Sequence, residues 1–564
     1  MKSKTKIIFI LLVFVCGFLL LGWRVFYLQH NCRDMYSFQT DIQQQMVVTD
    51  QPQRGTIMDR RGRIIAASNE IETVFVDLAA ITHIDVVKEI SLRLQEILDI
   101  PSHKICGMIL DSDSPRFIKI KTGITPQQRE GIRAADIRSV GIQSNWRRYY
   151  PSGSLLSHVV GFVGTEQKGL AGIEQRYESQ LAGSIGQGVM AIDVQRRPIG
   201  MRHQDIAIDG MGLILTIDSS IQQFAREALV KQYLDCQAES ATAIVIQPST
   251  GEVLAIVSLP DFEPDRLSSA NKNSLGNRAI TDPFEPGSIF KPIAASLALD
   301  VGAISISEKF YCEMGDYQGR GFGRIREWDN HQFGDMTVRQ ILTKSSNIGM
   351  AKIGQRMKSK RLYEGVKLFG FGSKTGIDLP GEDAGIVRDL KKWDGYSITR
   401  VPYGHEINVT AIQIARAYSI LANGGRFITP HIVKAIVEAD GNIRELKRPP
   451  PLAGQIIKPE TANWIVTKAL TDVIKKGTGT LAATEKWEVF GKTGTANIAN
   501  KGYDEKNYVA SFAGGGPADD PKVVILVSIR KPKKSLGKGY SGGRVAAPVF
   551  REILEKTLNY LEAR

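Results

Sequence analysis

Hydrophobic residues are spread unevenly along this chain of 564 residues, and the densest run lies near its start. Residues 7–23 contain no charged side chain, whereas three lysines precede the run and an arginine follows it. At about 1.5 Å per residue, a helix of this length spans roughly 26 Å, which approaches the hydrocarbon thickness of a bilayer. The pattern predicts a transmembrane helix at residues 7–29, after a cytoplasmic tail at residues 1–6.

The flanks of this run distinguish an uncleaved anchor from a signal peptide. No small-x-small cleavage site follows, and Trp23, Phe26 and Tyr27 lie where the helix would leave the bilayer. We therefore expect an anchor that stays attached. Because the lysines favour the cytoplasmic side, the pattern predicts a single-pass protein of the inner (cytoplasmic) membrane, with its bulk in the periplasmic or extracytoplasmic space.

The segment after the anchor is polar and rich in glutamine, which indicates a stalk at residues 30–49. Short apolar stretches at residues 56–58 and 63–66 then flank a charged turn that ends in Gly62, a pattern typical of a β-hairpin. Helical and strand patterns alternate to about residue 150, without candidate catalytic residues. We interpret residues 50–210 as a mixed α/β pedestal or docking domain.

The rest of the chain has strand patterns at both ends and helical patterns between them. The expected strands lie at residues 213–218, 243–247, 253–258, 487–492, 508–513 and 523–529. A helix at residues 221–233, capped by Asp218 or Ser219, and an amphipathic helix at residues 545–561 accompany them. This order favours an α+β domain over residues 211–564, with one antiparallel sheet and helices packed on its faces.

Composition and charge narrow the function only slightly. With 43% hydrophobic and 23% charged residues the chain is ordinary for a globular protein, and its formal net charge is +13. A basic balance suits nucleic acid, an anionic membrane or an acidic polymer. The basic residues are scattered and no nucleic-acid motif is present, so we expect no nucleic-acid partner.

The five cysteines are Cys16, Cys32, Cys106, Cys236 and Cys312. Their spacing contains no CxxC pair and no metal-type pattern, so we expect neither a metal site nor a cofactor. Disulfides and unpaired structural thiols both stay open for an oxidising compartment.

Ser288 and Lys291 form the first candidate chemical motif. They follow the turn Pro286-Gly287 and overlap a helix-forming run that includes Pro292, so both are expected on one face at a helix N-terminus. A serine hydroxyl needs a base to become a nucleophile, and burial favours neutral lysine, which can be that base. The same spacing recurs elsewhere in the chain, for example at Ser269 and Lys272, so it is informative only with the motifs that follow.

Ser345-Ser346-Asn347 is the second motif and follows a helical pattern. On an irregular connection, Ser345 and Asn347 can face one side of a cleft. Ser345 is then suited to pass a proton between Lys291 and a leaving amine, and Asn347 to hold a substrate amide. Alone, the triplet is equally typical of a helix cap.

Lys492-Thr493-Gly494-Thr495 is the third motif and follows a strand pattern. The absent side chain of Gly494 lets a bound peptide lie against the strand edge. Lys492 supplies positive charge, while Thr493 and Thr495 supply hydroxyls for a terminal carboxylate. The Thr495 N–H is a candidate oxyanion donor.

The ordered triple resembles the penicillin-binding proteins. Residues 284–292, 344–347 and 491–496 carry that resemblance. Residues 54–60 and 172–174 are similar to the pedestal of the class B, monofunctional subgroup, and no glycosyltransferase-like domain is recognised before them. Within class B the chain is most similar to the division-type proteins, and sporulation-type relatives are also similar.

The resemblance implies a peptidoglycan D,D-transpeptidase. Ser288 would attack the D-Ala-D-Ala carbonyl and expel the last D-alanine, and an amine of a neighbouring stem peptide would resolve the acyl-enzyme. β-Lactams would act as inhibitors that mimic the substrate. A division-type role would imply septal cell-wall synthesis, with a SEDS-type glycosyltransferase and other divisome proteins as partners.

Two departures from the family pattern are present. Ile289 stands where the family often has Thr, and Tyr403-Gly404-His405-Glu406 replaces a Gly-Gln-Gly or Gly-Tyr-Gly pattern. His405 can be a cleft residue or a structural histidine. These changes bear on the acyl acceptor and on drug affinity rather than on the class of reaction.

Several alternatives stay open at this point. An elongation-type transpeptidase, a β-lactam sensor and a β-lactamase-like protein can all use the same triple, and carboxypeptidase side activity needs only water as the acceptor. A non-catalytic scaffold is the alternative that is no enzyme. Intact Ser288, Lys291, Ser345, Asn347 and Lys492 argue against it.

Overall fold

The computed structural model describes residues 2–35, 45–78, 81, 83–112, 117–137, 139–192, 198–446, 454–499, 503–537 and 539–563. The chain forms two compact units. The first consists of Met1–Gln53, Ile71–Trp146 and Gly183–Gly210, and the second of Arg54–Glu70, Arg147–Ala182 and Met211–Arg564. Among the described residues, none of the five cysteines forms a disulfide.

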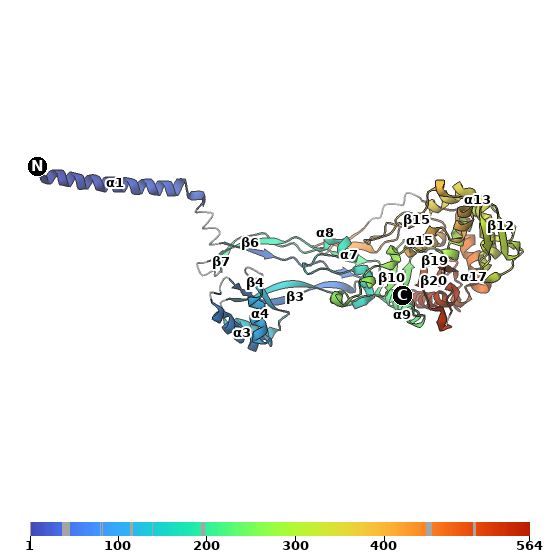
Figure 1. Ribbon diagram of the computed structural model, residues 1–564, viewed down its shortest axis with the longest axis horizontal. Coiled ribbons are helices and arrows are strands. Elements are labelled where there is room, and N and C mark those ends of the chain that lie inside the picture. The colour runs from blue at the N-terminus through green and yellow to red at the C-terminus, as the bar shows by residue number, and fades with distance from the viewer. Residues whose placement is uncertain are drawn as a thin grey trace. The chain divides into compact units, whose positions relative to one another are not determined.

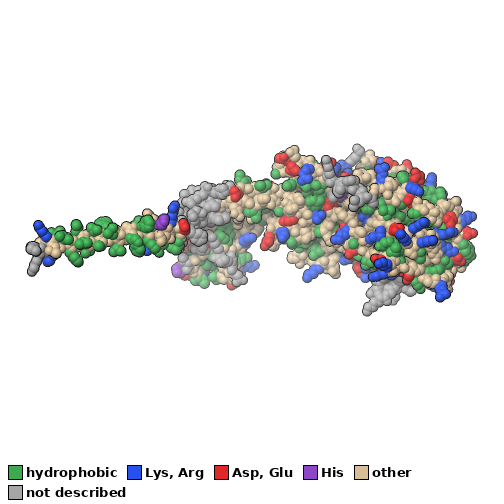
Figure 2. All heavy atoms as spheres, turned by 90° about the horizontal axis from the view of Figure 1, so that it is seen from above, with side chains coloured by type: hydrophobic (Ala, Val, Ile, Leu, Met, Phe, Trp, Pro, Cys, Tyr) green, Lys and Arg blue, Asp and Glu red, His purple; other side chains and the backbone are tan. Residues whose placement is uncertain are grey.

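The apolar run near the start forms one long helix, α1 (Lys2–His30). Its most apolar window has a mean hydropathy of 2.6, and none of that window is buried against the described residues. Figure 2 shows hydrophobic side chains along the visible face of this helix. By length and composition α1 can cross a membrane once, which agrees with the expected single anchor. In the expected stalk, residues 36–44 lie outside the described residues.

The first unit contains two small sheets. β1 (Gln45–Asp50) pairs with β6 (Gly186–Ile192), which pairs with β7 (Pro198–Gln204). Separately, the second half of β3 (Ile64–Asp77) pairs with β4 (Phe117–Thr122). Three helices accompany this pair, and their buried faces form one core with it: α3 (Ile84–Leu98), α4 (Ser102–Leu110) and α5 (Pro126–Ala135).

The second unit begins with the expected hairpin. β2 (Ile57–Met58) pairs antiparallel with the first half of β3, and the Asp59 carboxylate accepts hydrogen bonds from the turn N–H groups of Arg61 and Arg63. β8 (Gly212–Leu215) lies parallel to β2 and continues the sheet to β17 (Val433–Val437) and β18 (Ile443–Glu445). Short helices follow β5 (Val140–Tyr149): η2 (Gly153–Leu156), α6 (Ser157–Val160), α7 (Gly172–Arg176) and α8 (Glu178–Leu181).

A five-stranded antiparallel sheet forms the centre of the second unit, as expected. Its order is β10-β9-β21-β20-β19. The strands are β9 (Ser240–Ile246), β10 (Val253–Leu259), β19 (Phe490–Ala499), β20 (Tyr503–Gly516) and β21 (Val523–Arg530). β19 begins three residues later than the pattern indicates, because Thr484 closes a turn by hydrogen bonds with the N–H and carbonyl of Trp487.

Both faces of this sheet are covered by helices, so each strand buries alternate residues in different cores. Ala243 and Val245 of β9 pack with α9 (Ser219–Asp235) and α18 (Ala547–Glu562). Ile244 and Ile246 face the opposite core with α11 (Lys291–Asp300) and α15 (Ala411–Ala422). Figure 1 labels two of these helices, α9 and α15, near β10, β19 and β20 of this sheet. Such double burial explains why every residue of β9 is buried and why residues 243–246 are continuously apolar rather than alternating.

The middle of the chain supplies the remaining helices and three two-stranded sheets. The pairs are β11 (Lys309–Tyr311) with β14 (Asp335–Thr337), β12 (Asp316–Gly319) with β13 (Gly323–Arg326), and β15 (Ile386–Val387) with β16 (Ile407–Asn408). The α-helices are α10 (Arg278–Thr281), α12 (Val338–Lys344), α13 (Asn347–Leu368), α14 (Gly395–Arg400), α16 (Pro459–Trp464) and α17 (Thr471–Lys476).

Candidate active site

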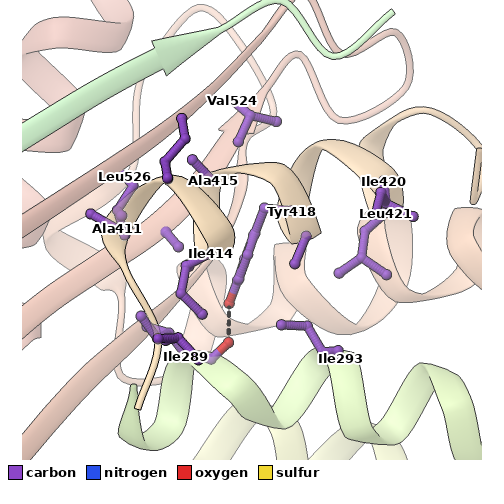
Figure 3. Packing of buried hydrophobic residues seen from close by; sticks show 14 of the residues in the cluster. Ile289, Ile293, Ala411, Ile414, Ala415, Tyr418, Ile420, Leu421, Val524 and Leu526 are labelled. Carbon is purple, nitrogen blue, oxygen red and sulfur yellow. Dashed lines mark hydrogen bonds between the residues drawn. The ribbon is translucent and has the colours of Figure 1, made fainter. Parts of the chain in front are cut away.

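Ser288 lies on a tight helical turn, η5 (Gly287–Phe290), that runs directly into α11. Gly287 adopts a φ of +57°, a conformation that suits glycine and turns the chain into the helix. The Tyr418 hydroxyl of α15 donates a hydrogen bond to the Ile289 carbonyl at 2.8 Å, as Figure 3 shows. Ile289 and Phe290 are fully buried, whereas Ser288 is partly exposed. The turn is therefore held in place by buried residues of the core, and Ser288 remains partly exposed.

Strand β19 passes close against this turn. A Cβ atom added at Gly494 would lie 3.0 Å from Ile289 Cγ2 and 3.1 Å from the Pro286 carbonyl oxygen. Gly404 also contacts the turn. Its carbonyl oxygen accepts a hydrogen bond from the Gly287 N–H at 3.0 Å. The absent side chain at residue 494 thus brings the third motif against the first, in addition to the expected room for a peptide.

Lys291 is fully buried, and its Nζ atom donates three hydrogen bonds to the second motif. The distances are 2.6 Å to the Ser345 carbonyl, 3.2 Å to Ser345 Oγ and 2.8 Å to Asn347 Oδ1. Burial lowers the pKa of Lys291 to about 7, and the negative charge of Glu327 opposes that shift. Near neutral pH a large fraction of this amine is therefore unprotonated, as a general base requires.

The connection between α12 and α13 presents Ser345 and Asn347 on one side. Ser345 adopts a left-handed φ of +62° at the end of α12, and Ser346 caps α13 by accepting a hydrogen bond from the Gly349 N–H at 2.9 Å. Both readings of this triplet therefore apply: Ser346 is the cap, while its neighbours Ser345 and Asn347 contact Lys291.

Lys492 lies in the interior rather than at the open strand edge. It is fully buried, and its Nζ atom donates to Ser345 Oγ at 2.9 Å and to the Thr493 carbonyl at 3.2 Å. Burial and the nearby charge of Lys291 lower the pKa of Lys492 well below its usual value. Ser345 Oγ thus lies between two buried lysine amines, an arrangement suited to moving a proton.

The two threonines of the third motif border the same region. Thr493 Oγ1 lies 2.7 Å from Thr478 Oγ1, and Thr495 Oγ1 accepts a hydrogen bond from the Gly542 N–H at 3.1 Å. Thr495 is partly exposed whereas Thr493 is buried. Of the two hydroxyls, that of Thr495 is the more accessible to a ligand.

Sequence reasoning missed Glu327, which lies directly behind the second motif. Its side chain is buried, and it accepts hydrogen bonds from the hydroxyl of Ser346 and from the N–H groups of Asn347 and Ile348. It belongs to no local motif and lies 20 residues before Asn347 in the chain. Only its position after β13 brings it to this site, so spacing carried no signal for it.

His405 lies beside the nucleophile turn. Its Nδ1 atom is 3.3 Å from Glu285 Oε2, and the Glu406 N–H donates to Glu285 Oε1 at 2.9 Å. Burial, with the charges of Lys291 and Arg400, lowers the pKa of His405 to about 4. The histidine is therefore neutral near pH 7.

The comparison with known proteins covers most of the chain. Residues 241–555 match the penicillin binding protein transpeptidase domain, and residues 49–215 match the penicillin-binding protein dimerisation domain. The stage V sporulation protein D of Bacillus subtilis is 31% identical over 98% of this chain and 85% of its own length. The peptidoglycan D,D-transpeptidase FtsI of Escherichia coli is 29% identical over 96% of this chain and 90% of its own.

A solved structure gives the same answer at the level of the fold. Penicillin binding protein 3 of Mycobacterium tuberculosis, in complex with aztreonam, has a TM-score of 0.70 and 26% identity over 91% of this chain and 97% of its own. The ordered motifs, their convergence around two buried lysines and these similarities agree, and the chain belongs to the penicillin-binding protein transpeptidase family.

Proposed function

We propose that this protein is a membrane-anchored, serine-type peptidoglycan D,D-transpeptidase. The observation that carries the proposal is the buried amine of Lys291, one helical turn after Ser288, with a pKa lowered to about 7. A lysine in this state can accept the serine proton near neutral pH without a histidine. The similarity to a relative named peptidoglycan D,D-transpeptidase supports the choice of substrate.

In the first step, Ser288 Oγ attacks the carbonyl carbon of a D-Ala-D-Ala stem peptide while its proton passes to Lys291 Nζ. The peptide C–N bond then breaks, and the departing D-alanine amine receives a proton through Ser345 Oγ, which contacts Lys291. We assign the developing oxyanion to the N–H groups of Ser288 and Thr495.

In the second step, an amine of a neighbouring stem peptide attacks the acyl-serine. Its proton returns through the same groups to Ser288 Oγ, which leaves as the free hydroxyl. Asn347 holds the substrate amide, and in the first step Thr493, Gly494 and Thr495 hold the terminal carboxylate, which then leaves with the D-alanine. Lys492 acts mainly on the proton path, because its Nζ atom contacts Ser345 Oγ from within the protein.

The biological setting belongs to the proposal as well. We place the N-terminus in the cytoplasm and the catalytic region outside the inner membrane, since three lysines lie in the first residues of α1, before its apolar run. A functional division into a stalk at residues 30–49, a pedestal at 50–210 and a transpeptidase domain at 211–564 suits this topology. Septal synthesis with a SEDS-type glycosyltransferase and divisome proteins is proposed from the similarity to FtsI, and an elongation role is the alternative.

Acylation by a penicillin tests the proposal. The full chain in detergent micelles is exposed to benzylpenicillin and analysed by intact mass and peptide mapping, beside Ser288→Ala. The matched control is Ser269→Ala, because Ser269 has the same spacing to a lysine, Lys272, but lies elsewhere on a short exposed turn. We expect a stable adduct on the Ser288 peptide in the wild type and the control.

Each other outcome has a definite meaning. An adduct absent from folded wild-type protein would refute the acyl-serine mechanism and favour a scaffold. An adduct that forms and disappears within seconds would favour a β-lactamase-like hydrolase. Release of D-alanine with incorporation of an added amino acid acceptor, against release into water alone, separates a transpeptidase from a carboxypeptidase.

A further inference from the structure

Glu327 is a buried carboxylate whose charge acts on Lys291 and which the mechanism above does not use. It follows β13 directly and is 4% exposed. One oxygen, Oε2, accepts a hydrogen bond from the Asn347 N–H at 2.7 Å. The other, Oε1, accepts from the Ile348 N–H at 3.2 Å and from the Ser346 hydroxyl. These donors occupy both oxygens of the carboxylate.

The Glu327 contacts determine where the second motif lies. The three donors belong to consecutive residues at the start of α13, immediately after Ser345. Asn347 is held twice, since its side-chain Nδ2 also donates to the Arg326 carbonyl at 3.1 Å. Its Oδ1 atom then reaches Lys291 Nζ at 2.8 Å. Residues 326 and 327 together therefore orient the amide that contacts the base.

The charge of Glu327 also acts on the base. The negative charge of this carboxylate acts to raise the pKa of three groups. They are Lys291 of α11, Tyr403 of η9 (Val401–Tyr403) and Cys312, which follows β11. The pKa values of Lys492 and His405 are lowered by burial and by the positive charge of Lys291. The negative charge of Glu327 thus opposes the effect of burial on the pKa of Lys291.

We propose that Glu327 is a positioning residue of the transpeptidase, which fixes Ser345 and Asn347 against Lys291 and sets the charge behind that base. The inference rests on the proposed function. A purely structural reading assigns Glu327 only to the N-terminus of α13, where a carboxylate suits the helix dipole. The two readings differ because only the first couples Glu327 to the protonation of Lys291.

Two substitutions separate charge from shape. Glu327→Gln keeps the length of the side chain and removes its charge. Glu327→Asp keeps the charge but shortens the side chain by one methylene group. The matched control is Glu364→Gln, on the same helix α13 but with a side chain that is 58% exposed. All are made in the full chain in detergent micelles.

The readout is the rate of acylation by a fluorescent penicillin as a function of pH. Removing the negative charge favours neutral Lys291, so Glu327→Gln is expected to move the midpoint of the rising limb to lower pH, while its plateau falls about tenfold. Glu327→Asp is expected to lower the plateau with an unchanged midpoint. Glu364→Gln is expected to change neither. A midpoint that stays in place in Glu327→Gln would refute the coupling to Lys291.

A second measurement does not depend on acylation. The melting temperature is followed from pH 6 to pH 10 for Glu327→Gln in the wild-type and Lys291→Met backgrounds. We expect the effect of Glu327→Gln to vary with pH in the first background and to be constant in the second. Equal curves in both backgrounds would overturn the inference even if no penicillin adduct forms, whereas failure of Ser288 acylation alone would overturn only the proposed function.

Discussion

Two clusters of buried basic side chains in the second unit have opposite electrostatics. Arg54 and Arg148 converge on Glu174, whose two oxygens lie 2.6 and 2.7 Å from their Nε atoms. Lys291 and Lys492 instead share the neutral hydroxyl of Ser345. Both clusters are almost inaccessible to solvent. The difference lies in whether a carboxylate makes direct contact with the buried cation.

The consequence of this difference appears in protonation. The contacts of Arg54 with Glu174 and Glu178 outweigh burial and raise the pKa of its guanidinium. Burial dominates for the lysines, and the pKa of each is lowered. A paired buried charge is fixed and structural, whereas an unpaired one gives up its proton and becomes a base. Burial thus accompanies a fixed structural charge in the arginine cluster and a lowered pKa, which suits a base, in the lysine cluster.

The largest effect is expected from removing the shared carboxylate of the arginine cluster. Glu174→Gln leaves Arg54 and Arg148 buried with no full counter-charge, so we expect the free energy of unfolding to fall by about 3–5 kcal/mol. Thermal unfolding of the full chain measures the loss. Glu178→Gln is the control, because Glu178 contacts Arg54 but is 30% exposed. Equal losses in the two variants would mean that Glu174 is not the centre of the cluster.

Lys291→Met tests the other cluster with two readouts. Acylation is expected to fall by about 10²–10⁴-fold, the usual contribution of a general base. The free energy of unfolding is expected to rise, because an apolar side chain of similar length replaces an amine whose burial is unfavourable. A variant that loses both activity and stability would contradict the contrast between the clusters.

The sign of the pH dependence follows from linkage for the same variant. The wild-type lysine has a pKa of about 7 when folded and 10.5 as its ordinary value, so between these pH values the unfolded state binds more protons. Wild-type stability therefore rises with pH across that window. The excess melting temperature of Lys291→Met should be largest at or below pH 7 and should shrink as pH approaches 10.5. An excess that is constant with pH would show that Lys291 does not titrate in this window.

The smallest effect is expected at His405, a basic group beside the nucleophile turn. Its pKa of about 4 means that it is neutral throughout pH 6–8 and does not titrate there. Glutamine is also neutral and can still contact Glu285. His405→Gln should change acylation by less than about threefold, with the same pH profile between pH 6 and pH 8. Loss of the rising limb in this variant would assign that limb to His405 instead of Lys291.

Local patterns were sufficient for several parts of the protein. The run before Arg24 predicted α1, and the turn at residues 59–62 predicted the β2–β3 hairpin. Ser288 and Lys291 lie one turn apart because the helix repeat relates them directly. In each case the residues concerned lie within a few positions of one another in the chain, so their arrangement can be predicted from the local sequence.

Element boundaries were harder to predict than element types. The start of β19 was placed three residues too early, because Trp487 and its neighbours have the composition of a strand but form a side-chain-closed turn. Compact units were also not readable from the order of the chain. Residues 54–70 and 147–182 belong to the same unit as the sheet that follows residue 211.

Local sequence patterns were enough to predict the class of chemistry: a serine and a lysine one turn apart, a hydroxyl and amide pair, and a strand with glycine between two threonines. Tertiary structure decided the state of those groups. The burial of Lys492, the approach of Gly494 to Ile289 and the place of Glu327 behind Asn347 all depend on segments far apart in the chain. The physical reason is that a pKa depends on desolvation and on neighbouring charges, which arise only when distant segments pack together.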